Sequence, residues 1–144
     1  MKIKFPFQIS LGMLVVFISW IRPHGQQEIE SAMNQYNHYI ISMNTDSIAS
    51  IFSPDGELGD IAHGRDSIKR FLYRFKDFKV LSQTSSTNTI SILGDSAIQY
   101  GTYWQTTIVP PKDTVHVKGS FTAKWIWDAV SGWKIKRMDT QPQR

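Results

Sequence analysis

Asp60 and His63 are the residues of this chain best placed to act as an acid or a base. They follow the turn-forming stretch 53–56, Ser-Pro-Asp-Gly. A histidine titrates near neutral pH and can move a proton without special tuning. An aspartate partly shielded by aromatic walls should have a raised pKa, and it could then serve as a base near neutral pH. A purely structural alternative is that Asp60 bonds to turn amides and that His63 packs at the start of a helix.

Aromatic residues supply the second part of a candidate site. Those that could contact a small apolar ligand are Tyr36, Tyr39, Tyr103, Trp125 and Trp127. The two tryptophans belong to the segment 119–139, whose β-branched and aromatic residues predict two strands joined by a turn. Rings this closely spaced must cover either a core helix or a pocket roofed by that helix.

Three helices are expected to position these residues. Apolar residues at spacings of three and four predict an amphipathic helix over 28–43. Asp46 or Ser47 can cap a short second helix. A third helix opens at 64–67, and its apolar stripe includes Leu72.

The rest of the chain is predicted to be strands. A short strand covers 57–62, and four long strands follow from Val80 to Asp139 as an antiparallel meander. Strand alternation places His116 on the wetter face, opposite Trp125. The order predicts an α+β cone, in which a curved antiparallel sheet wraps around the first helix, with two further helices. Small ligands are usually found at the open mouth of such a cone.

The first 26 residues have the pattern of a targeting segment. Two lysines precede the apolar run 9–21, which is short for a membrane span and suits the apolar part of a secretory signal. The stretch 22–26 has no Ala-x-Ala cleavage site, so a signal peptide and an uncleaved N-terminal anchor are both open. We expect a periplasmic or extracellular protein, membrane-anchored if the leader stays, whose domain 27–144 folds alone.

Composition limits the partners and cofactors. Of 16 basic and 12 acidic residues, three basic ones and no acidic one precede Glu28, so the net charge of +4 falls to +1 beyond the leader. We therefore expect no nucleic-acid partner, and we interpret the basic cluster between Arg65 and Lys79 as a solvated helix face. No cysteine is present, and no His/Asp/Glu cluster has ligand spacing, so neither a metal nor a cofactor is predicted.

Four blocks carry a resemblance to a known family: the tyrosine-bearing first helix, Phe52–Gly56, His63–Ile68 and the hairpin ending Gly132–Ile135. In their order and spacing they resemble the SnoaL-like branch of the nuclear transport factor 2-like superfamily. The resemblance covers about residues 28–139. It implies a small-molecule-binding domain with an aromatic-lined pocket and no assured catalysis, and it is compatible with a homodimer that pairs through the sheet.

The same resemblance implies an alternative, an acid–base enzyme of the isomerase or dehydratase type acting on a small apolar carbonyl or hydroxyl compound. In a ketosteroid-isomerase-like site Asp60 would be the base, and Tyr36 or Tyr39 would hold the enolate oxygen. The second acid of such a site is missing from 120–123, at a cost of several kcal/mol in transition-state stabilisation. A scytalone-dehydratase-like site would instead use His63 and His116 with Tyr100 or Tyr103.

Overall fold

The computed structural model describes residues 24–143, so most of the expected leader lies outside the described residues. The three helices are α1 (Gln26–Ser42), α2 (Thr45–Ile51) and α3 (Arg65–Tyr73). The strands are β1 (Phe52–Leu58), β2 (Ala62–His63), β3 (Lys79–Leu93), β4 (Ser96–Val109), β5 (Asp113–Asp128) and β6 (Gly132–Pro142). None of the helices in this part of the chain is long and apolar enough to cross a membrane.

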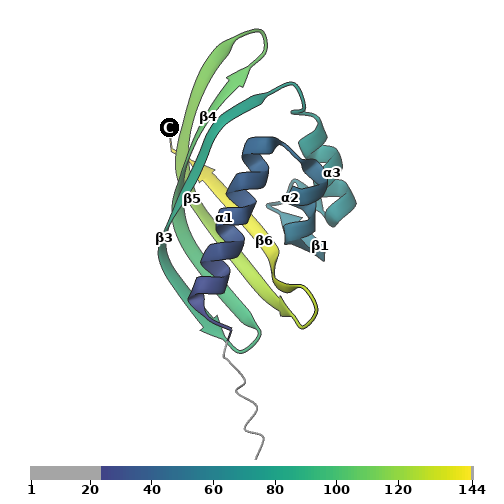
Figure 1. Cartoon of the computed structure of the whole chain (residues 1–144), viewed down its shortest axis with the longest axis vertical. Coiled ribbons are helices and arrows are strands. Elements are labelled where there is room, and N and C mark those ends of the chain that lie inside the picture. Colours follow the sequence, from purple (N-terminus) through teal and green to yellow (C-terminus); the bar gives the residue numbers. More distant parts are fainter. Residues whose placement is uncertain (1–23, 144) are drawn as a thin grey trace, which may run out of the picture.

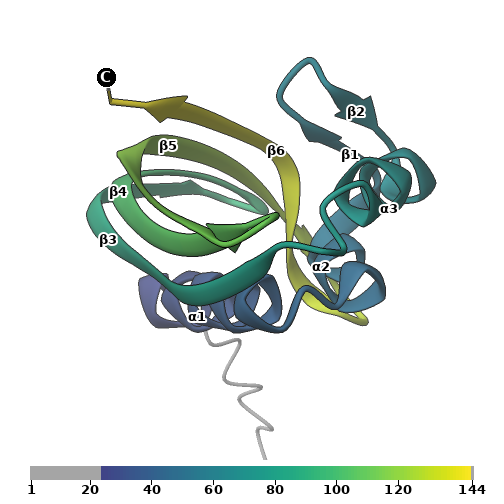
Figure 2. The same ribbon diagram turned by 90° about the horizontal axis from the view of Figure 1, so that it is seen from above.

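One curved six-stranded sheet forms the wall of the fold, in the order β2-β1-β6-β5-β4-β3 (Figures 1 and 2). The four long strands form the predicted antiparallel meander. The sheet is mixed rather than wholly antiparallel, because β1 pairs parallel to β6. Helix α1 lies across the concave face, and α2 and α3 pack beside β1 (Figure 2).

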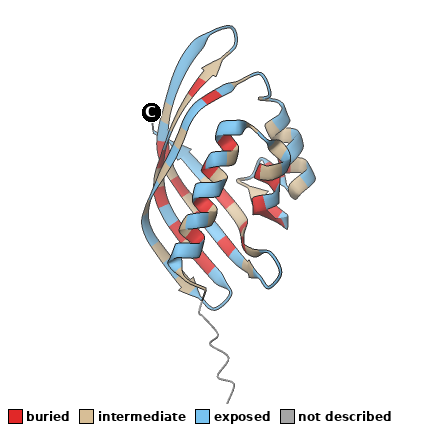
Figure 3. Ribbon diagram, viewed as in Figure 1, coloured by how far each residue is buried: buried red, intermediate tan, exposed pale blue. Residues whose placement is uncertain are grey.

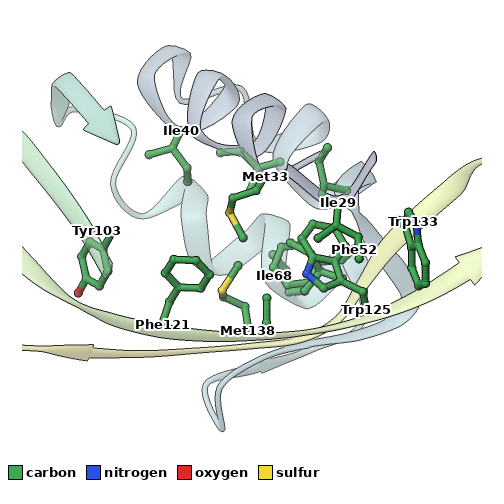
Figure 4. Close-up of a cluster of buried hydrophobic side chains, with 14 of the residues drawn as sticks. Ile29, Met33, Ile40, Phe52, Ile68, Tyr103, Phe121, Trp125, Trp133 and Met138 are labelled. Carbon is green, nitrogen blue, oxygen red and sulfur yellow. The ribbon is translucent and has the colours of Figure 1, made fainter. Parts of the chain in front are cut away.

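The core lies between α1 and the concave face of the sheet, where buried positions alternate along the strands (Figure 3). Ile29, Met33 and Ile40 face inward from α1, as the helical spacing predicted. Phe121 and Trp125 of β5 meet them from the sheet (Figure 4). Burying large side chains of this kind stabilises the fold by about 1.5–3 kcal/mol each.

The turn expected at 53–56 lies inside strand β1, where pairing with β6 is interrupted. Phe52 pairs with Ile135 and Glu57 with Arg137, and the four residues between them have no partner on β6. The backbone approaches closely there: a Cβ added at Gly56 would lie 2.9 Å from the Phe52 Cβ atom and 3.0 Å from the Ile135 carbonyl oxygen. The Pro-Asp-Gly stretch therefore forms a bulge within β1, where its local preference for a turn bends the strand between two paired segments.

Two boundaries also differ from expectation. The cap of α2 is Asn44, whose Oδ1 atom accepts a hydrogen bond from the Ser47 N–H at 3.0 Å, rather than Asp46 or Ser47. Helix α1 begins at Gln26, just before the expected domain start at residue 27. The His24 ring stacks on Trp127 with 3.4 Å between ring centroids, so the end of the expected leader contacts the domain.

Candidate functional site

Two of the predicted tyrosines, Tyr36 of α1 and Tyr103 of β4, belong to the interior of the cone. Burial, with a smaller effect of the nearby Tyr103, raises the pKa of Tyr36 to about 12. Burial also raises the pKa of Tyr103. Both hydroxyls therefore stay protonated at neutral pH, where each can donate or accept a hydrogen bond.

A chain of polar side chains crosses the interior from β5 to α1. Trp125 Nε1 donates to Gln99 Oε1 at 3.0 Å, and Gln99 Nε2 donates to Thr87 Oγ1 at 2.8 Å. The Thr87 hydroxyl donates to Glu30 Oε2 at 3.0 Å. Trp125 is 2% exposed, and its N–H is satisfied within this chain. We therefore assign Trp125 to the core and not to a pocket wall.

An apolar pocket of about 270 Å³ lies between the C-terminal end of α1, α3 with the segment after it, and the sheet. We call it the mouth pocket; its lining residues are Ile40, Met43, Leu72, Phe75, Phe78, Val80, Gln105 and Thr107. Figure 1 shows that the β4–β5 hairpin extends beyond this end of α1. The pocket thus lies at the end of the cone where α1 finishes, and no residue of the short strand 57–62 lines it.

The wall on the α3 side comes from an aromatic series that continues past the end of the helix. The Phe71 and Phe75 rings meet edge to face at 5.3 Å between centroids, and Phe75 and Phe78 meet in the same way at 5.3 Å. Two backbone hydrogen bonds stabilise the turns that follow α3. The Phe75 N–H donates to the Leu72 carbonyl oxygen, and the Phe78 N–H donates to the Phe75 carbonyl oxygen. This geometry keeps the Phe75 and Phe78 rings against the pocket although α3 ends at Tyr73.

The polar groups of the mouth pocket are an amide and a hydroxyl. Gln105 Nε2 donates to Thr107 Oγ1 at 2.8 Å, a bond that does not use the side-chain carbonyl oxygen of Gln105. The described lining includes no Asp, Glu, His, Lys or Arg. The arrangement can hold a compact apolar molecule with one hydrogen-bonding group, and its volume is just below the usual range for small-molecule sites.

Asp60 and His63, the predicted acid–base pair, do not line the mouth pocket. The side chain of Asp60 is 92% exposed and that of His63 is 64% exposed. Asp60 lies in the β1–β2 turn, where Gly59 has a positive φ of 51°. The hydrogen bond from Arg137 and its positive charge lower the pKa of Asp60. The pKa of Asp60 is therefore shifted in the opposite direction to the rise expected for a shielded base.

Arg137 is the centre of an ion-pair network at the exposed end of β1. Its guanidinium donates to Glu57 Oε2, Asp60 Oδ1 and both carboxylate oxygens of Asp139, each at 2.8 Å. Glu57 is opposite Arg137 in the parallel β1–β6 register, so the two side chains share one face of the sheet. The hydrogen bond from Arg137, together with its charge, also lowers the pKa of Glu57. This cluster is an ion-pair network that attaches the small β1–β2 hairpin to β6.

The remaining predicted residues are dispersed. The Tyr39 hydroxyl accepts a hydrogen bond from Gln35 Nε2 at 2.7 Å. Trp127 is half-buried beneath His24. His116 is exposed and contacts Thr106 Oγ1 through Nδ1 at 3.0 Å, which confirms its predicted place on the wetter face.

Sequence reasoning missed most of the mouth pocket. The stripe of α3 that includes Leu72 was visible, whereas Phe78, Gln105 and Thr107 gave no separate signal because they come from a turn and a distant strand. Within residues 24–143 no three His, Cys, Asp or Glu side chains lie together in a way that could hold a metal ion.

A curved mixed sheet around one long helix, with two further helices at its side, is the nuclear transport factor 2-like cone fold. The SnoaL-like domain family matches residues 24–139, and the chain belongs to this family. No curated protein sequence matches the chain significantly.

Solved structures resemble this one at low sequence identity. A protein of unknown function from Mycobacterium tuberculosis has a TM-score of 0.73 and 15% identity, covering 82% of this chain and 76% of that one. A ketosteroid isomerase-like protein from Erwinia carotovora atroseptica has a TM-score of 0.72 and 14% identity, with coverage of 82% and 95%. A nuclear transport factor 2-like superfamily protein from Salmonella enterica serovar Typhimurium has a TM-score of 0.69 and 18% identity, with coverage of 82% and 90%.

Proposed function

We propose that this chain is a binding domain for a small, largely apolar molecule, which occupies the mouth pocket. The observation that carries the proposal is the lining itself: six apolar side chains surround about 270 Å³ and a single Gln105–Thr107 polar pair. Apolar walls provide affinity by removing ligand surface from water, and a single polar pair orients the ligand. Membership of the SnoaL-like family is consistent with this function.

The alternative, an acid–base enzyme with Asp60 or His63 as its base, has weaker support. A general base must come within about 2.6–3.2 Å of the heavy atom whose proton it removes, or reach it through one water. Asp60 is instead paired with Arg137, and His63 Nδ1 lies 3.5 Å from Glu57 Oε1. A base stabilised as an ion pair at the solvent surface is also a weak one, because the lowered pKa reduces its proton affinity.

Two further parts of the proposal concern location and assembly. We propose export to the periplasm or the cell exterior, on the strength of the basic and apolar N-terminal leader. We also propose that two copies pair through the outer face of the sheet, where Tyr100 and Trp104 are about half exposed. Light scattering coupled to size-exclusion chromatography tests the pairing, and a monomer at high concentration contradicts it.

The binding function is testable with a neutral apolar dye such as N-phenyl-1-naphthylamine, whose fluorescence rises on transfer from water to an apolar site. We expect saturable binding to the protein. Leu72→Trp places a larger ring in the mouth pocket and should weaken dye binding by about tenfold, since filling the pocket removes the apolar contacts.

Tyr73→Trp is the matched control, because Tyr73 is the next residue of α3, is 58% exposed and does not line the pocket. Its dye affinity should equal that of the unchanged protein. Equal binding by Leu72→Trp would place the dye elsewhere and overturn the proposed site. Asp60→Asn should also leave dye binding unchanged; a loss there would favour the enzyme alternative.

A further inference from the structure

A second cavity, of about 380 Å³, lies where β1 and the start of α3 meet the β5–β6 hairpin. Three cationic side chains line it: Arg65 of α3 and Lys134 and Lys136 of β6. Ile126 and Trp127 contribute apolar surface. We call this cavity the basic pocket. It shares no lining residue with the mouth pocket.

The acidic residues of the basic pocket already have other partners. Asp55 forms an ion pair with Lys136. Asp128 Oδ1 accepts hydrogen bonds from the Val130 N–H at 2.9 Å and the Ser131 N–H at 2.8 Å, and so closes the β5–β6 turn. These contacts lower the pKa of Asp128 and keep it ionised. This pairing leaves Arg65 and Lys134 as the cations of the basic pocket that form no ion pair with its carboxylates.

Arg65 and Lys134 are held by backbone carbonyl groups instead of carboxylates. Arg65 Nε donates to the Phe52 carbonyl oxygen at 2.8 Å, and Lys134 Nζ donates to the Ser50 carbonyl oxygen at 3.0 Å. Among the described residues, neither side chain forms an ion pair. The Arg65 contact uses Nε and leaves the two terminal nitrogens of the guanidinium for another acceptor.

These two anchored cations also repel each other. Burial lowers the pKa of Lys134 and the Arg65 charge lowers it further, while the Asp128 charge opposes them without reversing the shift. Two like charges in a partly buried cavity are unfavourable unless an opposite charge comes between them. Carbonyl anchors on both side chains keep the pair in place, so the site is already organised for an anion before one binds.

We propose that the basic pocket binds a small oxyanion, the carboxylate or phosphate group of a ligand, between Arg65 and Lys134. Arg65 supplies a planar donor that suits two oxygen atoms at once, and Lys134 supplies a point charge. Ile126 and Trp127 provide an apolar edge for the body of the ligand. This site is independent of the proposed function of the mouth pocket, and either can fail alone.

NMR titration of the protein with inorganic phosphate, and separately with benzoate, tests the proposal. Chloride is exchanged for each anion at constant ionic strength, which removes general screening effects. We expect saturable shifts of the Ser131 and Gly132 amides and of the Trp127 indole, all near the pocket. Saturation by phosphate alone, by benzoate alone or by both supports the site and identifies the preferred oxyanion.

Variants distinguish a specific anion site from nonspecific attraction of anions to lysine side chains. Lys134→Gln and Arg65→Gln should each weaken binding by about tenfold or more, because each removes a charged donor. Lys124→Gln is the control, since Lys124 is an exposed lysine of β5 outside the pocket, and its affinity should change less than about twofold. An equal effect of Lys124→Gln overturns the proposal, as does the absence of saturation up to about 0.1 M anion.

A second measurement keeps the test decisive if either pocket variant fails to fold. Lys134→Arg keeps the charge and should retain saturable binding at the same amides. The unchanged protein should also gain thermal stability with rising phosphate or benzoate at constant ionic strength, as linkage requires for a ligand of the native state. No gain in stability with either anion would overturn the site.

Discussion

The two buried tryptophans of the sheet allow the contribution of one hydrogen bond to the free energy of unfolding to be measured separately. Trp125 and Trp133 are 2% and 5% exposed. Trp125 Nε1 donates to Gln99 Oε1 at 3.0 Å, whereas Trp133 Nε1 is buried without a hydrogen-bond partner among the described residues. Changing each to Phe removes the same indole atoms, so most of the packing loss is common to both variants.

The difference lies in what each change leaves behind. Trp125→Phe leaves the Gln99 oxygen buried and unpaired, since Gln99 is 0% exposed. An unsatisfied buried acceptor costs about 1–3 kcal/mol. Trp133→Phe removes a donor that had no partner and incurs no such cost. We therefore expect Trp125→Phe to lower the free energy of unfolding by about 1–3 kcal/mol more than Trp133→Phe does.

Urea denaturation followed by far-UV circular dichroism measures both losses without relying on tryptophan fluorescence. A double variant, Trp125→Phe with Gln99→Leu, is the control. It should recover part of the loss, because it replaces both partners of the hydrogen bond with apolar groups. A difference below about 0.5 kcal/mol between the two single variants would refute the reasoning, since that is the usual limit of additivity.

Three other predictions follow from individual contacts. Trp133→Ala should destabilise the protein by about 3–5 kcal/mol in urea denaturation, and a loss under about 1 kcal/mol would mean that this ring is not packed in the core. The hydrogen bond from Arg137 and its charge lower the pKa of Asp60 in the folded protein. The ion pair should therefore stabilise the fold above the usual carboxyl pKa of about 3.9, and this stabilisation should be lost as the pH falls through the lowered pKa of Asp60. NMR titration of Asp60 should show this lowered pKa, and Arg137→Met should return it toward 3.9; a raised pKa contradicts the assignment. His24→Ala should lower the free energy of unfolding by about 0.5–1.5 kcal/mol through the lost stacking on Trp127, which denaturation of both proteins checks.

Local periodicity was enough to predict the elements and their buried faces. The spacing along α1 identified Ile29 and Met33 as core residues, and strand alternation placed His116 outside and Trp125 inside. These predictions hold because the side-chain direction repeats every 3.6 residues in a helix and every two in a strand, whichever partner the element packs against. The resemblance carried by four short blocks then led from these elements to the family.

The tertiary structure decided which side chains meet. Asp60 and His63 have the residue types of an acid–base pair, but the parallel pairing of β1 with β6 brings Arg137 beside them and leaves both exposed. The mouth pocket likewise joins Leu72 of α3 to Gln105 of β4, which lie 33 positions apart in the chain. Chain periodicity specifies the direction of each side chain, whereas the convergence of distant side chains depends on strand register and helix packing. The sequence by itself therefore determined the class of fold, and the pairing of distant strands determined which side chains come together.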